Sequence, residues 1–274
     1  MDLSDTPQLA THLTAPPTGR PGMPREILRF EGVGLAYGEH AVLRDVSFSV
    51  RSGETIALLG PSGCGKTTLL NIVAGFLRPT AGVALCDNRE ISEPGPDRGV
   101  VFQSYALFDW MTVAENIAFS LRCAGAPKEQ QHETARRMAS LVGLSGFERS
   151  YPYQLSGGMR QRCGLARVLA ASPSVMLMDE PFAAVDVQTR ETLQEEILRI
   201  QASTGCTILF VTHSIDEAVF LGDRIFLMLK DGQGRFEEFP VALPEPRDQS
   251  ENRLHPEFLS VREKVYRAMR GIGH

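Results

Sequence analysis

The chain has 274 residues, of which 43% are hydrophobic and 22% are charged, and its formal net charge at pH 7 is −5. This length and composition suffice for one sizeable globular core and for two compact units at most. The mildly acidic balance argues against the strongly basic surface of a nucleic-acid-binding protein, and the sequence has no apolar run of about 18 residues that would predict a membrane-spanning helix. The five cysteines match no metal-binding spacing and are expected to be reduced, cytosolic thiols.

The N-terminal part of the sequence divides into a leader and a pair of strands. Residues 1–24 are rich in Thr, Pro and Gly and lack the apolar core of a signal peptide, so we expect a disordered leader. Apolar alternation then predicts short strands over residues 33–36 and 42–50, around a turn at Gly38-Glu39.

The next segment has the order strand, glycine-rich loop, helix. The compact apolar run Thr55–Leu59 predicts a buried strand, and residues 67–76 predict a helix that is punctuated by Gly75 and Pro79. This order is the structural context that a phosphate-binding loop requires.

Strands and helices alternate through the rest of the sequence. This alternation predicts an α/β layered core with a helical insertion between Gln103 and Ser156, and the sequence shows no internal repeat. The expected strands are residues 99–103, 175–178 and 207–211, the expected helical regions are 113–144, 157–171, 189–203 and 215–221, a hairpin over 223–239 turns at Asp231-Gly232, and the tail is Pro-rich from Val241 and helical over 256–270.

The loop after the first buried strand matches the pattern G-x-x-x-x-G-K-[ST] in full. Its glycines let successive N–H groups point at phosphate oxygens, and the following helix adds its positive end. Lys66 would reach the β- and γ-phosphates of ATP, and Thr67 would coordinate Mg²⁺. A thiol at Cys64 lies inside this loop, so alkylation there is expected to block ATP hydrolysis. The nucleotide-binding candidates are Gly60, Pro61, Ser62, Gly63, Cys64, Gly65, Lys66, Thr67 and Thr68.

Two further segments carry candidate chemistry. Asp179 and Glu180 follow a buried strand, so Asp179 would face the Mg²⁺ water shell and Glu180 would deprotonate the attacking water. Taken alone, this pattern also fits a buried strand that ends in solvated acids. Ser156 precedes Gly157 and Gly158 at an expected helix start, which would make a second phosphate site for ATP held by another copy of the chain. An ordinary Ser-capped helix remains an equal alternative for that segment.

The ordered set of these motifs resembles an ATP-binding-cassette (ABC) ATPase. It consists of residues 60–67, Gln103, residues 155–159, Asp179-Glu180 and His213, and the likeness covers about residues 27–239. The resemblance implies an α/β fold, with a P-loop NTPase core of ABC type, a small antiparallel β subdomain and a helical subdomain at about residues 104–156. The ATPase domain would span residues 25–240, and residues 241–274 would form a C-terminal tail.

The resemblance also implies roles for single residues. Tyr37 would stack on adenine, although a core tyrosine is its plain alternative. Gln103 would contact Mg²⁺ and its water and link the site to a membrane partner, and His213 would hold the γ-phosphate in line with Glu180. Ser156 and Gly158 would touch the γ-phosphate across a head-to-tail homodimer.

The segment after the acidic pair departs from the family pattern. Asp186, which would make a dimer contact, is present, whereas Ala183 and Val185 replace the usual small or hydroxyl residue and Leu. The detailed geometry of that contact is therefore left open.

The single cassette without a long heptad run favours a transporter motor over a soluble ABC ATPase that acts on nucleic acid or ribosomes. Separate subunits resemble bacterial importers, and residues 108–116 resemble the segment that receives a permease helix. Residues 93–103, Asp109-Trp110, 215–224 and 243–248 resemble the nitrate, sulfonate and taurine importer group, with a leaning towards taurine. The expected partners are a second copy, integral-membrane permease subunits and, indirectly, a periplasmic or lipoprotein substrate-binding protein, with no nucleic acid. The expected location is the cytoplasmic face of the inner membrane, as a peripheral subunit.

Overall fold

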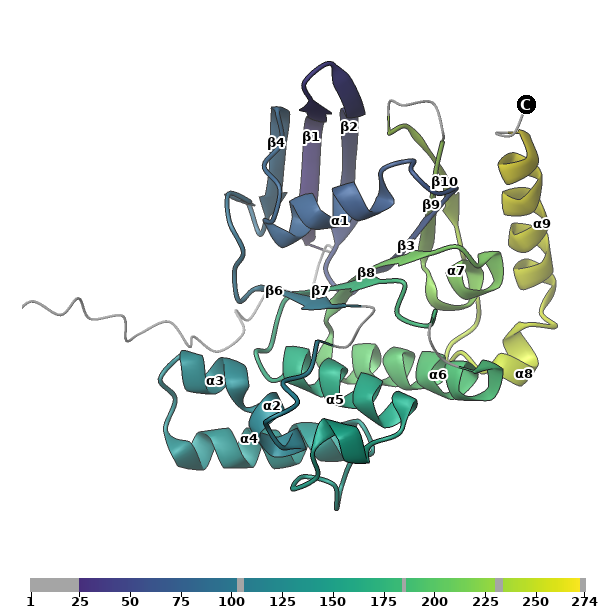
Figure 1. The fold of residues 1–274 in the computed structure, drawn as a ribbon. Helices are drawn as coiled ribbons and strands as arrows, with labels where there is room; N and C mark the ends of the chain where they lie inside the picture. The colour runs from purple at the N-terminus through teal and green to yellow at the C-terminus, as the bar shows by residue number, and fades with distance from the viewer. Residues whose placement is uncertain (1–24, 103–105, 184–185, 230–233, 272–274) are drawn as a thin grey trace, which may run out of the picture.

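The structure is a computed structural model that describes residues 25–102, 106–183, 186–229 and 234–271. Over these residues the strands form two sheets, one antiparallel and one mostly parallel (Figure 1). The antiparallel sheet has the order β2-β1-β4-β5, and its strands are β1 (Glu26–Tyr37), β2 (His40–Arg51), β4 (Ala81–Cys86) and β5 (Arg89–Glu90). The second sheet has the order β10-β9-β3-β8-β7-β6, and its strands are β3 (Thr55–Leu59), β6 (Arg98–Val101), β7 (Val175–Asp179), β8 (Thr207–Thr212), β9 (Arg224–Met228) and β10 (Phe236–Pro240).

The parallel strands of the second sheet end together at one edge. β3 pairs in parallel with β8, and β8 with β7, so that Leu59 is opposite Thr212 and Asp179 is opposite Val211. The loops that leave β3, β7 and β8 therefore meet at this edge, which is where ligands bind in open α/β sheets. The register explains how segments more than a hundred positions apart in the sequence can build one site.

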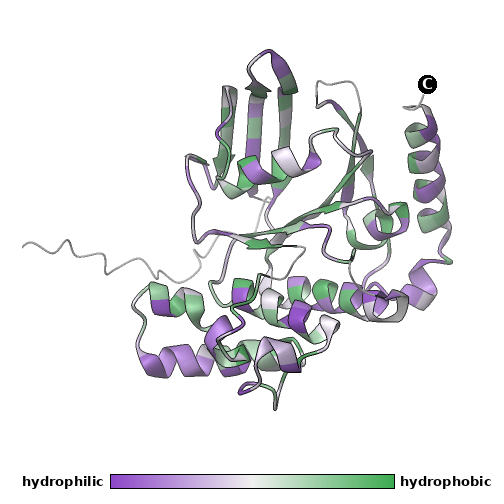
Figure 2. Cartoon of the chain, viewed as in Figure 1, coloured by the Kyte–Doolittle hydropathy of each residue, from purple (hydrophilic) through white to green (hydrophobic). Residues whose placement is uncertain are grey.

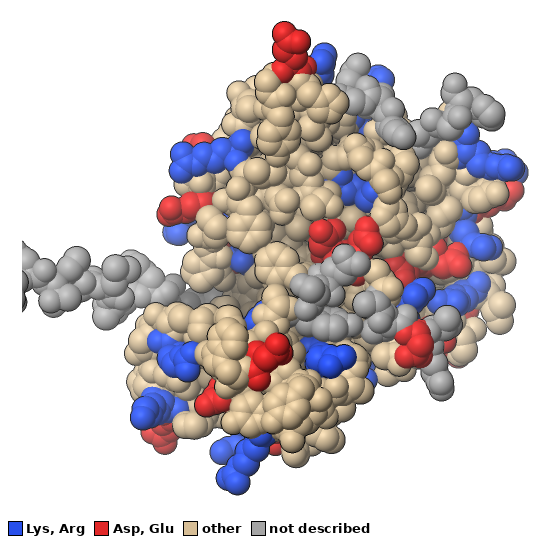
Figure 3. Space-filling view, viewed as in Figure 1, with Lys and Arg blue, Asp and Glu red and all other residues tan. Residues whose placement is uncertain are grey.

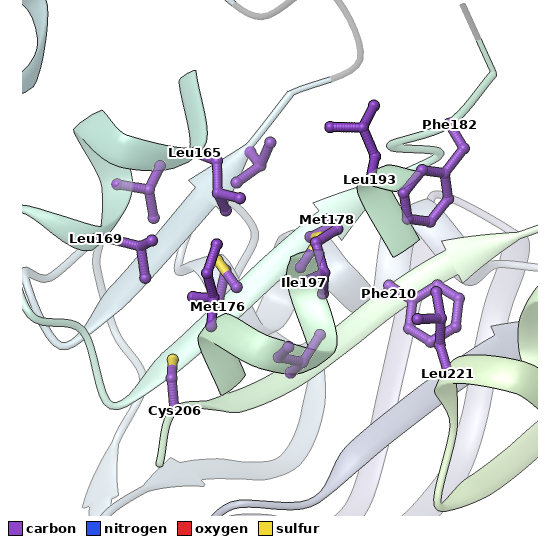
Figure 4. Close-up of a cluster of buried hydrophobic side chains, with 14 of the residues drawn as sticks. Leu165, Leu169, Met176, Met178, Phe182, Leu193, Ile197, Cys206, Phe210 and Leu221 are labelled. Atoms are coloured by element: carbon purple, nitrogen blue, oxygen red, sulfur yellow. The ribbon is translucent and has the colours of Figure 1, made fainter. Parts of the chain in front are cut away.

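Both faces of this sheet are covered at its centre, and the central strands β3, β7 and β8 are accordingly buried along almost their whole length. In β7, Val175 and Leu177 face one hydrophobic cluster, whereas Met176 and Met178 face the other, as the period of two requires. The first cluster lies against α1 (Lys66–Ala74) and the antiparallel sheet. The second lies against α5 (Gly157–Leu169) and α6 (Val187–Thr204) (Figures 1 and 2). Figure 4 shows side chains of β7, β8 and these helices pointing into that second cluster.

A helical region lies beside α5, built from α2 (Val113–Ile117), α3 (Phe119–Cys123), α4 (Lys128–Leu141) and the 3₁₀ turn η1 (Pro152–Gln154). Thr112 and Glu115 form a reciprocal capping box at the start of α2. The buried side chain of Asn116 accepts a hydrogen bond from Phe108 N and donates to Phe108 O and Met111 O, which fixes the preceding loop. The predicted helical stretch over residues 113–144 is therefore correct in type but divided into three helices.

The C-terminal tail packs against the core. It contains α8 (Gln249–Asn252) and α9 (Pro256–Gly271), and α9 lies against α7 (Ile215–Leu221). The buried Arg247 guanidinium donates to Phe220 O at 3.1 Å and to Gly222 O at 2.9 Å, and Arg262 pairs with Asp216 at 2.6 Å. The tail is thus joined to the helix that follows β8.

The predicted layered α/β core, the antiparallel sheet and the helical region are confirmed. The strands around Gly38-Glu39 are longer than predicted, because β1 and β2 pair along their full lengths. Among the described residues, β4, β5, η1 and α8 were not predicted. The predicted turn at Asp231-Gly232 and the 1–24 leader lie outside the described residues. No helix among the described residues combines the length and apolarity needed to cross a bilayer.

Candidate nucleotide-binding and catalytic site

The loop between β3 and α1 curls tightly at two glycines. Gly60 has a φ of +149° and Gly65 a φ of +103°, which is the region where a side chain would be strained. A Cβ at Gly60 would lie 2.6 Å from Met228 O, and one at Gly65 would lie 2.9 Å from a methyl carbon of Leu43. Gly60 therefore requires glycine for space as well as for backbone angle, because its close neighbour is a backbone carbonyl, whereas at Gly65 the backbone angle is the firmer requirement. Ser62 and Gly63, at the outer part of the loop, are exposed.

The Lys66 side chain crosses this loop from the first turn of α1. Its Nζ donates to Gly60 O at 2.8 Å and to Pro61 O at 2.9 Å, and the residue is only 5% exposed. A positive charge is thus held at the centre of a loop whose N–H groups and helix end already favour anions.

Cys64 lies under the same loop, with its Sγ 3.9 Å from Lys66 Nζ. Burial raises the pKa of the Cys64 thiol, although the Lys66 charge opposes this shift. A buried, protonated thiol reacts slowly, so alkylation of Cys64 is expected to be slow in this conformation.

Thr67 and Asp179 meet where α1 begins and β7 ends. Thr67 Oγ1 donates to Asp179 Oδ1 at 3.4 Å. Burial, and after it the negative charge of Glu180, raises the pKa of Asp179. The Thr67 hydroxyl and the Asp179 carboxylate fit a Mg²⁺ ion, which binds through one or two carboxylates together with substrate phosphates. The raised pKa of Asp179 indicates that its negative charge is not fully compensated by the side chains around it. Within the described ranges, no cluster of three or more His, Cys, Asp or Glu residues could hold a metal by itself.

Glu180 and His213 form the next pair along this edge. His213 Nε2 lies 2.6 Å from Glu180 Oε1, and both side chains remain partly exposed. Glu180 has a φ of +47°, which is uncommon for a residue with a side chain, and its N–H donates to Val211 O at 3.2 Å. The strained backbone turns the carboxylate towards the loop after β8, so the pair is held by the sheet register and by this turn.

Ser156 lies at a different place from the loop at residues 60–67. Its Oγ accepts from Met159 N at 3.3 Å and caps α5, which packs on the opposite face of the sheet from α1 (Figure 1). A Cβ at Gly157 would meet open space, whereas one at Gly158 would lie 3.0 Å from Thr189 on α6. The structure therefore separates the two predicted phosphate-binding segments within one chain.

Asp186 lies beside that second segment. Its carboxylate accepts from Thr189 N at 3.0 Å and from Thr189 Oγ1 at 2.7 Å, which caps the start of α6. Tyr37, the candidate for adenine, is 58% exposed at the end of β1. Thr68 is half-buried in α1, and Gln103, like Val185, lies outside the described residues.

Three residues near the pair of Glu180 and His213 were not predicted. Glu217, Thr212 and Arg190 line a pocket of about 210 Å³ together with Glu180 and His213. The available signal was the Ser-x-x-Glu pattern that ends at Glu217, which predicts a helix N-terminus. In the structure the Glu217 carboxylate instead accepts a hydrogen bond from Thr212 Oγ1.

Comparisons with known proteins agree on one family. The family model described as ABC transporter matches residues 43–183. An ABC transporter ATP-binding protein of Methanocaldococcus jannaschii is 50% identical over 224 residues, covering 81% of this chain and 82% of that protein. The taurine import ATP-binding protein of Yersinia pestis is 46% identical over 244 residues, covering 87% of this chain and 95% of that protein.

Solved structures show the same fold. The cbiO1 protein of Clostridium perfringens, part of the ABC transporter complex cbiONQ, superposes with a TM-score of 0.73 at 26% identity, over 79% of this chain and 89% of that one. A dimeric ATP-binding cassette in a post-hydrolysis state, bound to ADP and Pi, superposes with a TM-score of 0.68 at 30% identity, over 79% of this chain and 99% of that one. The predicted resemblance and fold class are confirmed, and the chain belongs to the ABC transporter family as an ATP-binding ATPase cassette.

Proposed function

We propose that this ATPase powers an importer, working through a separate membrane permease, and that its cargo is a small sulfonate such as taurine. The support comes from taurine import ATP-binding proteins of Yersinia pestis and Roseobacter denitrificans, which are 46% and 45% identical over 87% of the chain. Aliphatic sulfonates and nitrate are the other cargo candidates. In this proposal the chain is a peripheral subunit at the cytoplasmic face of the membrane, and a substrate-binding protein delivers the cargo on the other side.

Nucleotide binding is assigned to the loop of residues 60–67 and to Tyr37. The loop amides and the Lys66 ammonium would bind the phosphates, and the exposed Tyr37 ring would stack on adenine. Thr67, Asp179 and Gln103 would hold Mg²⁺, which would neutralise charge on the β- and γ-phosphates.

Hydrolysis is assigned to Glu180 and His213. The observation that carries this assignment is the 2.6 Å contact between their side chains, at the same sheet edge as Lys66 and Asp179. Glu180 would accept a proton from the attacking water, while His213 orients that carboxylate and donates to the γ-phosphate. Lys66 would stabilise the charge that develops on the transferring phosphoryl group.

A second copy of the chain would complete each site. The helix that Ser156 caps packs on the opposite face of the sheet from α1, which supports the assignment of Ser156 and Gly158 to ATP held by the other chain. The exposed Asp186 would contact the second copy next to them. The dimeric, ADP-bound cassette that shares this fold supports the arrangement.

The permease contact is assigned to the aromatic surface before α2. Trp110 is 72% exposed, and its ring lies 5.5 Å from that of Phe108, whose other neighbours are Phe119 and the Arg167 guanidinium. An exposed aromatic on a fixed support is typical of a binding hot spot. On the face drawn in Figure 3, acidic and basic side chains are interspersed, and this mixture does not resemble the basic stripe of a nucleic-acid-binding protein.

Uptake in a deletion strain tests the proposal. We expect loss of labelled taurine uptake, restored by the wild-type gene and not by one that encodes Glu180→Gln. Labelled aliphatic sulfonate and nitrate serve as parallel cargoes. Normal uptake of all three compounds in the deletion strain would contradict the importer assignment, and loss of nitrate uptake alone would move the cargo away from sulfonates.

A further inference from the structure

A buried carboxylate lies next to the catalytic pair without belonging to it. Glu217, in the first turn of α7, is 8% exposed and lines the same 210 Å³ pocket as Glu180 and His213. Burial raises the pKa of its carboxyl, although the Thr212 hydroxyl and the Arg190 charge lower it. Burying a carboxylate is costly unless its oxygens find polar partners, and both oxygens of Glu217 have one.

One oxygen of Glu217 is hydrogen-bonded to the loop that carries His213. Thr212 Oγ1 donates to Glu217 Oε2 at 2.5 Å, and the same hydroxyl accepts from Ser214 N at 3.0 Å. Ser214 Oγ in turn accepts from Glu217 N at 3.3 Å. The residues on both sides of His213 are therefore hydrogen-bonded to Glu217, either directly or through one hydroxyl.

The other oxygen of Glu217 faces the helix that follows Asp186. Arg190 Nε lies 3.8 Å from Glu217 Oε1. Arg190 is in the first turn of α6, where its N–H donates to Asp186 O at 2.9 Å, and Asp186 caps that turn. A continuous set of contacts thus runs from the exposed Asp186 through Arg190 and Glu217 to the loop of His213.

We propose that Glu217 is a positioning residue. When Asp186 contacts a second copy of the chain, Glu217 transmits that contact to His213 and, through His213, to Glu180. The inference rests on the proposed hydrolytic roles and on the proposed dimer. When the partner fixes Asp186, the first turn of α6 presents Arg190 to Glu217, and the carboxylate holds Thr212 and Ser214 so that His213 stays in contact with Glu180.

The carboxylate is not needed simply to anchor α7. Ala218, Val219 and Phe220 of this helix are each fully buried in the core, and such apolar packing supplies most of the free energy that holds a helix in place. Loss of the Glu217 charge should therefore affect the rate of hydrolysis more than the stability of the fold.

The test compares Glu217→Gln with Arg190→Gln and with the double variant, in the full-length protein with Mg-ATP. A loosened catalytic group costs on the order of tenfold in rate or more, so each single variant should lose about tenfold in kcat with little change in KM for ATP. The double variant should be no slower than the single ones, because both remove the same link. Glu263→Gln, on the exposed face of α9, is the matched control and should keep the wild-type kcat.

Thr212 provides a second, independent test. Thr212→Val removes the hydroxyl that joins Ser214 to Glu217 and should lower kcat. Thr212→Ser keeps that hydroxyl and should keep the wild-type kcat. Thermal unfolding of every variant separates a lost link from a weakened fold. The positioning role is wrong if Glu217→Gln keeps the wild-type kcat, if the two single effects multiply in the double variant, or if the loss of kcat follows the fall in Tm.

Failure of this inference can be told apart from failure of the proposed roles. Glu180→Gln measures the assigned base directly. If Glu180→Gln stops hydrolysis while Glu217→Gln has no effect, only the link is refuted. If Glu180→Gln hydrolyses ATP at the wild-type rate, the proposed catalytic roles fail first.

Discussion

The loop at residues 60–67 and the helix start at Ser156 differ in how their polar groups are satisfied. In the loop, the nearly buried Lys66 ammonium bonds to the carbonyls of Gly60 and Pro61, so the chain itself holds the charge in place. Ser156 is exposed and caps its own helix, with open space over Gly157. The first segment is therefore preorganised within one chain, whereas the second is a surface that gains its function when another molecule covers it. The variants below test this difference, and one of them tests the packing of the C-terminal tail.

The largest effect is expected at the sheet edge where the loop of residues 60–67 meets Asp179 and Glu180. Glu180→Gln should lower kcat by about a hundredfold or more, because an amide cannot accept the proton of the attacking water. ATP should still bind, and ATP-dependent dimers should accumulate. Phosphate release measures the rate, and light scattering after gel filtration measures the dimer. Turnover at the wild-type rate would remove Glu180 from its assigned role.

Two inactive variants should restore activity when they are mixed. Lys66→Ala should weaken nucleotide binding, since it removes the buried ammonium, and Gly157→Asp places a charge on the surface proposed to face the partner's phosphates. The structure has room for a side chain at Gly157, so that variant should fold. A mixed dimer would then contain one intact site, made from the Gly157→Asp chain's loop and the Lys66→Ala chain's Ser156 segment.

Phosphate release from the mixture, compared with each variant alone, decides the point. Gly157→Ala is the control for the substitution itself and should hydrolyse ATP like the wild type. If each site were built within one chain, both chains of the mixed dimer would remain defective. A mixture no more active than its components would therefore contradict the shared site.

The next effect concerns stability rather than rate. Arg247→Met leaves two backbone carbonyls and Asp223 without a buried guanidinium, which should lower the free energy of unfolding by about 2 kcal/mol. Arg267→Met, whose side chain is 76% exposed on α9, should change it by less than about 0.5 kcal/mol. Urea unfolding measures both. Equal stability of the two variants would show that the tail does not depend on Arg247.

The smallest effect is a gain of stability at Asp179, on the same sheet edge. In the folded state the pKa of Asp179 is raised above its ordinary value, so folding favours the protonated acid. The contribution of this group to the free energy of unfolding therefore falls as the pH rises through the raised pKa. At pH 7 Asp179→Asn removes an unfavourable, partly buried charge and should raise Tm by about 2 °C in the absence of nucleotide. The same variant should lose hydrolysis. An unchanged or lower Tm in thermal scans would contradict the assigned penalty.

Local patterns in the sequence were sufficient to predict structure where the residues of a short segment favour one conformation by themselves. The apolar run Thr55–Leu59 followed by glycines and Lys66 predicts strand, loop and helix, and all three are confirmed. The strands β4 and β5 were not predicted, because they have only six and two residues. Each is held by pairing with a neighbour, β4 with β1 and β5 with β4. The division of the helical region was also missed, although Gly125, with a φ of +73°, and Pro127 separate α3 from α4.

The sequence by itself predicted the kind of chemistry, because the order of its motifs, with Lys66, Asp179, Glu180 and His213, resembles that of the ABC ATPases, and the family is confirmed. Tertiary structure alone decided which of them meet. The parallel register of β3, β8 and β7 brings their ends to one edge, and hydrogen bonds link Glu217 to Thr212 beside His213. It also decided that the Ser156 segment lies across the sheet from α1. Spacing in a sequence does not encode such long-range geometry, because register and packing arise only when the whole core forms.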